Sequence, residues 1–172
     1  TIVSLRKIAN DVDFVYENDT DIQELVELAV LQLAREINNG PGTFEEKLKK
    51  AEVIYNNQPA LNQRDSSKIE FQQYSTPVPI GFLAGGFVSN WGLFNGVVLD
   101  PSAGNGSLLV YFDIQNIRAN EIDNARVNNL KKQGIDATLL DGRQPMPDGP
   151  FDAIVTNPPF GSQTAVTYDG KY

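Results

Sequence analysis

The stretch that decides the fold is VVLDPSAGNG, residues 97–106. An apolar strand ends at Asp100, and the chain then turns through Gly104 and Gly106 before Ser107 begins a predicted helix. Glycine adopts positive φ easily and lets a ligand approach the backbone, and a helix N-terminus adds partial positive charge. Together, these features predict a site for a nucleoside-bearing cofactor at the carboxyl edge of a parallel sheet.

The residues around this turn exclude two common nucleotide-binding motifs. A dinucleotide fingerprint requires a third glycine three residues after Gly106, where the chain has Leu109. A P-loop requires Gly-Lys followed by Ser or Thr, and that tripeptide is absent. A strand-to-glycine turn is often only a tight connection, so the identity of the cofactor depends on motifs further along the chain.

The composition of the chain narrows its chemistry. The 172 residues include no cysteine and no histidine. We therefore expect no disulfide framework, no metal site of the usual zinc type and no histidine base. No apolar run approaches the ~20 residues of a membrane span, so we expect a cytoplasmic protein without a membrane partner.

Residues 1–71 are predicted to form an N-terminal helical region. Apolar residues recur at helical spacing over 20–39, and a second helix opens at Thr43 with Glu46 three residues on, as in a capping box. A shorter helix is expected over 3–8. The amphipathic spacing of the two long helices favours packing elements over a binding site.

Residues 72–172 are predicted to form an incomplete α/β domain. Thr76 can cap a helix that begins at Pro77, just before the glycine turn. The strands that follow are expected to be parallel, in the spatial order 3-2-1-4. They are expected over residues 97–100, 117–121, 137–140 and 151–156.

Two of these strands end in further acids. Glu121 lies about 20 residues after Asp100, the spacing of the acid that holds a ribose diol, and a carboxylate suits a diol because it only accepts hydrogen bonds. The alternative is that Glu121 is an acid near a helix start, but Asp123 is the better cap for the helix that follows. The third strand ends at Asp141-Gly142, where a carboxylate could accept from an adenine amine.

The fourth predicted strand runs into Asn157-Pro158-Pro159-Phe160. Two successive prolines end the strand, remove two backbone donors and fix φ. The result is a rigid rim with backbone carbonyls, an amide side chain and an aromatic face. At the tip of the strand beside the glycine turn this rim predicts a binding surface, because ligands bind beyond the carboxyl ends where the strand order reverses.

In order, these motifs resemble the γ-type amino-methyltransferases that act on adenine in DNA. They are YSTP (74–77), DPSAGNG (100–106), ANEID (119–123), LLDG (139–142) and FDAIVTNPPFG (151–161). The resemblance is greatest to modification subunits of type I restriction systems and to methylase domains of large phage and mobile-element polypeptides, and it covers about residues 72–162. It implies a Rossmann-like fold specific to S-adenosylmethionine (AdoMet) dependent methyltransferases, an N-terminal helical extension, and AdoMet as the cofactor.

The resemblance also implies a role for each motif residue. Those that would hold AdoMet are Tyr74, Thr76, Asp100, Pro101, Ser102, Gly104, Gly106, Glu121, Ile122, Asp141 and Gly142. Asp100 and the glycines would line its methionine side, Glu121 would hold the ribose and Asp141 the adenine amine. Gly142 stands where some relatives carry a bulkier residue over the adenine. The target base would enter a pocket formed by Asn157, Pro158, Pro159 and Phe160.

The chemistry of methyl transfer suits these residue types. An aromatic amine is a poor nucleophile because its lone pair is delocalised into the ring. If the side-chain oxygen of Asn157 and the carbonyl of Pro158 accept both amine hydrogens, the nitrogen is drawn towards tetrahedral geometry and its lone pair points at the sulfonium methyl. Catalysis then rests on positioning, without a general base before attack. The target base leaves the duplex, and Phe160 offers it a stacking face.

DNA is the expected partner, but this chain would supply little of the contact. The net charge is −8, whereas a domain that grips nucleic acid alone usually carries a basic stripe. We therefore expect other parts, including a specificity or helicase partner or domain, to bind the DNA. Methyltransferase sheets of this type usually have seven strands, so we expect this chain alone to be inactive. We also expect residues 153–155 to form an unpaired edge that self-associates or is covered by the N-terminal helices.

Two other interpretations stay open. The acceptor could be a guanine amine in rRNA or a glutamine side chain in a protein, since relatives with Asn-Pro-Pro-Phe or Asn-Pro-Pro-Tyr methylate both. The chain could instead be a non-catalytic AdoMet-binding or assembly module. Phe160-Gly161 and the YSTP segment favour DNA.

Overall fold

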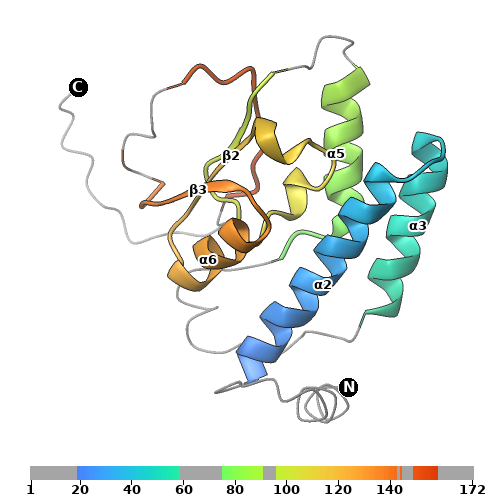
Figure 1. Ribbon diagram of the computed structural model, residues 1–172, viewed down its shortest axis with the longest axis horizontal. Helices are drawn as coiled ribbons and strands as arrows, with labels where there is room; N and C mark the ends of the chain where they lie inside the picture. Colours follow the sequence, from blue (N-terminus) through green and yellow to red (C-terminus); the bar gives the residue numbers. More distant parts are fainter. Residues whose placement is uncertain (1–18, 59–74, 91–95, 143, 145–148, 159–172) are drawn as a thin grey trace.

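The computed structural model describes residues 19–58, 75–90, 96–142, 144 and 149–158 (Figure 1). The helix expected over 3–8 and the predicted boundary between residues 71 and 72 lie outside these ranges. Among the described residues, no helix is long and apolar enough to cross a membrane.

The centre of the fold is a four-stranded parallel sheet in the order β3-β2-β1-β4. The strands are β1 (Val98–Asp100), β2 (Ile117–Glu121), β3 (Asp136–Leu139) and β4 (Ala153–Ile154). The predicted α/β class and strand order are therefore confirmed. The expected fourth strand is too long, although the amides of Asp152 and Val155 still donate to the carbonyls of Val97 and Leu99.

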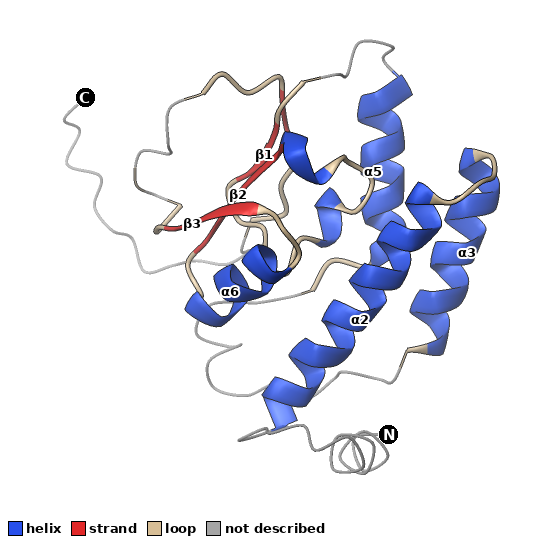
Figure 2. Ribbon diagram, viewed as in Figure 1, coloured by secondary structure: helices blue, strands red, loops and turns tan. Residues whose placement is uncertain are grey.

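The main core lies on one face of this sheet. Val98 pairs in register with Ile117, and Ala119 lies two residues further along β2, so all three side chains point to the same face. Helix α6 (Asn124–Lys132) packs there with Val127 and Leu130. Helix α5 (Val78–Asn90) contributes Ala84 and Val88 to the same cluster. Figure 2 shows α5 and α6 beside the strands.

A second core joins the N-terminal helices to α5. Helices α2 (Asp19–Asn39) and α3 (Phe44–Asn57) pack against each other and against α5 (Figure 1). The ring of Tyr111 lies edge-on to the rings of Phe44 and Phe82, with ring centroids 5.9 Å apart in each pair. The buried members of this core are Val30, Leu31, Ala34, Ala51, Val78, Phe82 and Val110.

The predicted capping box at the start of α3 is confirmed and gives a stability test. The Thr43 hydroxyl accepts from the Glu46 amide at 3.3 Å, and the Glu46 carboxylate accepts from the Thr43 amide at 2.9 Å. Thr43→Ala is expected to lower the free energy of unfolding by about 1 kcal/mol, because it leaves an N-terminal amide of the helix without its side-chain acceptor. Urea denaturation measures this loss, and an unchanged midpoint would contradict the role of the cap.

Strand β4 lies at one edge of the described sheet, and Ile154 on it is 62% exposed. The expectation that the N-terminal helices cover this strand is wrong for Ile154. Helices α2 and α3 bury their apolar residues against α5 instead. Self-association along β4 stays a prediction.

Candidate functional site

The glycine turn links β1 to the rest of the site. Gly104 and Gly106 have φ values of 56° and 92°, in the left-handed region. A Cβ at Gly106 would lie 3.1 Å from Leu130 Cδ2, so a side chain there would be both strained and crowded. The turn is therefore built for glycine at this position.

The helix predicted after the turn does begin at Ser107, but it is only a short 3-10 helix. Residues Ser107–Leu109 form a single 3-10 turn, η1, and Ile114–Asn116 form another, η2, directly before β2. Only ten residues separate Gly106 from the start of β2, too few here for a regular crossover helix. A three-residue turn has no appreciable macrodipole, so the expected positive charge of a helix N-terminus is absent from η1.

Asp100 is buried at the tip of β1. It is 1% exposed, and its Oδ1 accepts from the Ser102 amide at 3.0 Å. The pKa of Asp100 is raised to about 7, chiefly by burial and also by the nearby Glu121, while hydrogen bonds from Ser102 and Thr156 oppose the rise. Asp100 is thus a carboxyl group that a nearby positive charge could ionise near neutral pH.

Glu121, at the tip of β2, holds the glycine turn in place. Its Oε2 accepts from the Gly104 amide at 2.8 Å, and its Oε1 accepts from the amides of Ile122 and Asp123 at 2.8 and 3.0 Å. These bonds use three of the roughly four acceptor positions of a carboxylate, which leaves capacity for one further donor at Oε2. Ile122 is exposed beside it.

The tip of β3 is tied to the same edge by Asn120. Its Nδ2 donates to the carbonyls of Pro101 at 3.1 Å and Leu140 at 2.9 Å, and its Oδ1 accepts from the Leu140 amide at 3.1 Å. Beyond Leu140, a Cβ built on Gly142 would lie 3.3 Å from the Pro101 carbonyl oxygen. The segment that contains Asp141 and Gly142 therefore lies against the turn after β1.

Beyond β4, Asn157 meets the segment before α5. Its Nδ2 donates to Thr76 Oγ1 at 3.1 Å, although the two residues are 81 positions apart. The Thr76 carbonyl in turn accepts from Ser107 Oγ at 2.6 Å. Pro158 is exposed next to Asn157, whereas Tyr74, Pro159 and Phe160 lie outside the described residues. The structure thus brings the predicted catalytic amide against Thr76, which was predicted to hold AdoMet.

Sequence reasoning missed several residues of this arrangement. Asn120 and Thr156 are polar residues within or beside predicted strands, a pattern that could have marked them as strand-tip ligands. Asn105 is buried between the two glycines, where it bonds to α6 and α2. The helix over 20–39 was predicted only to pack, yet Glu24 on α2 contacts the turn, and the pattern of that helix gives no signal of this.

Comparisons of the chain with models of protein families, with curated proteins and with solved structures gave no match.

Proposed function

We propose that this chain is an AdoMet-dependent methyltransferase domain with a Rossmann-like fold, which methylates the N6 amine of adenine in DNA. The observation that carries the proposal is the contact between Asn157 and Thr76 at the edge that also carries Asp100 and Glu121. β1 has β2 on one side and β4 on the other, so the strand order reverses there. Ligands of open parallel sheets bind outside the strand ends at such a point.

The residues at this edge fit the charge and the hydroxyls of AdoMet. The cofactor has a cationic sulfonium centre and a ribose diol. Asp100 and Glu121 are buried carboxylates, and Glu121 Oε2 has room for one further donor. Among the described residues, a Cβ built on Gly104 would come within 4 Å only of Arg126 Nη1, at 3.7 Å, so these residues leave room beside the turn. Asp141, beside the Pro101 turn, is assigned to the adenine amine.

Asn157 is assigned the central role in methyl transfer. Because its Nδ2 donates to Thr76, its Oδ1 is the atom left to accept a hydrogen from the target amine. The Pro158 carbonyl would accept the second amine hydrogen. When bound, AdoMet supplies the electrophilic methyl group. Asn157 and Pro158 orient the amine lone pair, and the surplus proton leaves to solvent after transfer.

A calorimetric titration with AdoMet tests the proposal, and Asp100 gives it a pH signature. A cationic ligand favours the ionised form of Asp100, whose pKa is raised to about 7. If AdoMet binds only when Asp100 is ionised, its apparent affinity should rise with pH, by about tenfold between pH 6 and pH 8, because the ionised fraction of Asp100 rises by that factor. At pH 7, binding should release protons, which titrations in buffers of different ionisation enthalpy will detect.

Asp100→Asn should flatten this pH dependence, while Asp136→Asn, at an exposed carboxylate near the start of β3, should retain it. Ionisation of AdoMet itself is common to all three proteins and cancels in the comparison. Absence of AdoMet binding at every pH would sink the proposed function. Binding with the same pH dependence in Asp100→Asn would leave the function standing but remove Asp100 from the cofactor site.

A further inference from the structure

Helix α2 reaches the glycine turn through Glu24. One carboxylate oxygen, Oε2, accepts from Asn105 Nδ2 at 2.5 Å, and the other, Oε1, pairs with Arg126 Nη2 of α6 at 3.2 Å. The Glu24 side chain is only 14% exposed and that of Arg126 is buried. Burial alone would lower the pKa of Arg126, but the neighbouring carboxylates of Glu24, Glu27 and Glu121 raise it. Arg126 is therefore cationic at neutral pH.

Asn105 is held by three hydrogen bonds to side chains of α2 and of the α6 region. Besides Glu24, its Oδ1 accepts from Asn129 Nδ2 at 3.1 Å and its carbonyl accepts from Gln133 Nε2 at 2.9 Å. Asn105 lies between Gly104 and Gly106, both of which have positive φ. The side chain of Asn105 thus connects the glycine turn to α2 and α6.

A second side chain of α2, that of Glu27 one helical turn on, reaches the segment that contains Ser75 and Thr76. Ser75 Oγ donates to Glu27 Oε2 at 2.6 Å, and Ser75 directly precedes Thr76. Burial raises the pKa of Glu27, and Glu24 adds to the rise. Glu24 and Glu27 therefore contact the two walls of the site, the glycine turn and the segment that holds Asn157 through Thr76.

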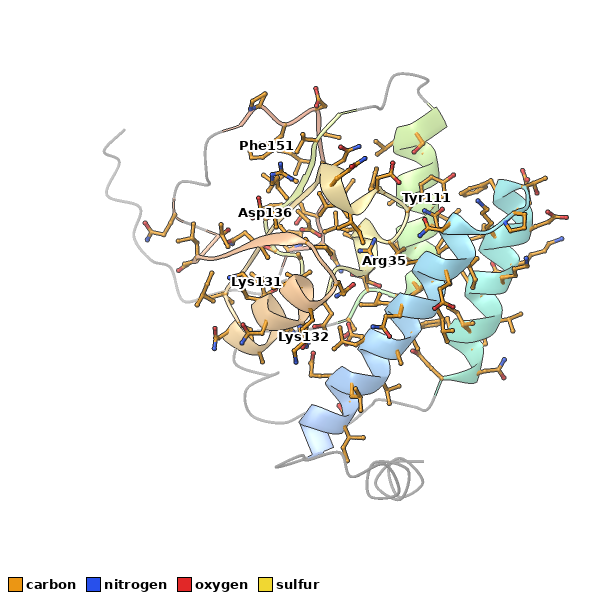
Figure 3. All side chains as sticks on the ribbon, viewed as in Figure 1. Arg35, Tyr111, Lys131, Lys132, Asp136 and Phe151 are labelled. Carbon is orange, nitrogen blue, oxygen red and sulfur yellow. The ribbon has the colours of Figure 1, made fainter. Side chains whose placement is uncertain are left out.

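Further along, α2 is fixed to the same part of the chain. Arg35 Nη1 donates to the Leu109 carbonyl at 3.4 Å, and Asn38 Nδ2 donates to the Tyr111 carbonyl at 2.9 Å. Figure 3 shows Arg35 and Tyr111 where α2 passes the loop after the glycine turn. Helix α2 therefore runs alongside residues 105–111 and cannot shift without moving them.

We propose that Glu24 is a positioning residue, which sets the conformation of the glycine turn through Asn105 and makes helix α2 part of the cofactor site. Its effect on AdoMet affinity rests on the proposed function, but its effect on the turn does not. The N-terminal region is then needed for the shape of the site as well as for packing.

Glu24→Gln tests this inference, with Glu36→Gln as the matched control at an exposed carboxylate of the same helix. The substitution replaces one carboxylate oxygen by an NH2 group that cannot accept a hydrogen bond, so the bonds from Asn105 and Arg126 can no longer both form. We expect amide hydrogen exchange at residues 104–106 to speed up by about tenfold, and AdoMet binding to weaken by about tenfold. Exchange in α3, away from the turn, should stay unchanged, and Glu36→Gln should match the wild type in all three measurements.

A double variant that reverses donor and acceptor in the hydrogen bond between residues 24 and 105 should restore the glycine turn. In the double variant Glu24→Gln/Asn105→Asp the new amide can donate to the new carboxylate, which can still accept from Asn129, and the net charge equals that of the wild type. Asn105→Asp alone places two carboxylates in contact and should loosen the turn. The double variant should regain slow exchange at residues 104–106.

Exchange in Glu24→Gln that equals the wild type would overturn the inference. If this single variant fails to fold, the double variant decides: restored protection of the turn supports the inference, and no restoration overturns it. A wild-type chain that does not bind AdoMet would sink the proposed function alone, because the exchange measurements need no ligand.

Discussion

Gly81→Ala is expected to destabilise the fold by about 2–3 kcal/mol, although alanine in place of glycine in an exposed helix stabilises by about 1 kcal/mol. A Cβ at Gly81 would lie 2.0 Å from the Ser107 carbonyl oxygen and 3.1 Å from Val110 Cγ2. The nearest atom belongs to the backbone of η1, which cannot turn aside as a flexible side chain can. Helix α5 would have to move away and open the core that contains Phe82.

The displacement should also reach the functional site. Ser107 Oγ donates to the Thr76 carbonyl at 2.6 Å, so a movement of α5 from η1 would break the bond that fixes Thr76 beside Asn157. Urea denaturation will measure the loss of stability. Ile80→Ala, at a 47% exposed position of the same helix, should cost no more than about 1 kcal/mol. Equal or greater stability of Gly81→Ala would mean that α5 does not pack against η1 as closely as the structure has it.

Strands and helices that are marked by a hydrophobic pattern and by capping or turn residues were predictable from the sequence. The second strand has the predicted bounds, 117–121, and the helix after it begins behind the predicted cap, Asp123. An apolar strand that ends in an acid and is followed by a turn and a capped helix can be recognised from residues that are close together in the sequence. Alternation of these units along the chain favoured a parallel sheet, and the order 3-2-1-4 was expected from the resemblance to methyltransferases.

Contacts between distant segments were not predictable in the same way. Gly81 and Gly85 look like weak helix formers in the sequence, and only the approach of residues 107–111 shows why side chains are excluded there. The carboxylate of Glu24 pairs with Arg126 across 102 positions. Nothing in an amphipathic helix pattern distinguishes such a carboxylate from solvated ones such as Glu36.

The site was predicted as a set of strand tips, and its described members do meet at one edge of the sheet. The glycine turn contacts Glu121, and Asn157 contacts Thr76. What the sequence did not supply is how each group is held. Asp100 has the environment of a carboxyl that titrates near neutral pH because β1 is buried, and a sequence contains no measure of that burial.

Asn157→Ala is expected to reduce methyl transfer by about 10²–10³-fold or more while it leaves AdoMet affinity within about twofold of the wild type. The substitution removes the acceptor that would hold one hydrogen of the target amine, so the lone pair stays delocalised in the ring. The cofactor contacts proposed for Asp100, Glu121 and the glycine turn do not involve this side chain. The loss should therefore fall on the transfer step and not on cofactor binding.

Thr76→Val tests whether the orientation of the Asn157 amide matters, because the variant keeps the amide and removes the group that orients it. It keeps Asn157 but removes the hydroxyl that accepts from Nδ2 at 3.1 Å, so the amide can rotate and present its donor to the target amine. We expect an intermediate loss of activity, by about tenfold, because one positioned hydrogen bond is lost while the acceptor remains. Asn128→Ala, the same substitution as Asn157→Ala at an exposed position of α6, should retain full activity.

Transfer of labelled methyl groups to DNA, in the protein that carries this chain, and calorimetric AdoMet titration together measure these effects. DNA that lacks adenine should accept no label, and this control distinguishes methylation of adenine from methylation of another base. Parallel loss of AdoMet affinity and activity in Asn157→Ala would assign the amide to the cofactor instead of the target base. Full activity in that variant would remove Asn157 from the mechanism, because no neighbouring side chain described at the tip of β4 offers an equivalent amide oxygen.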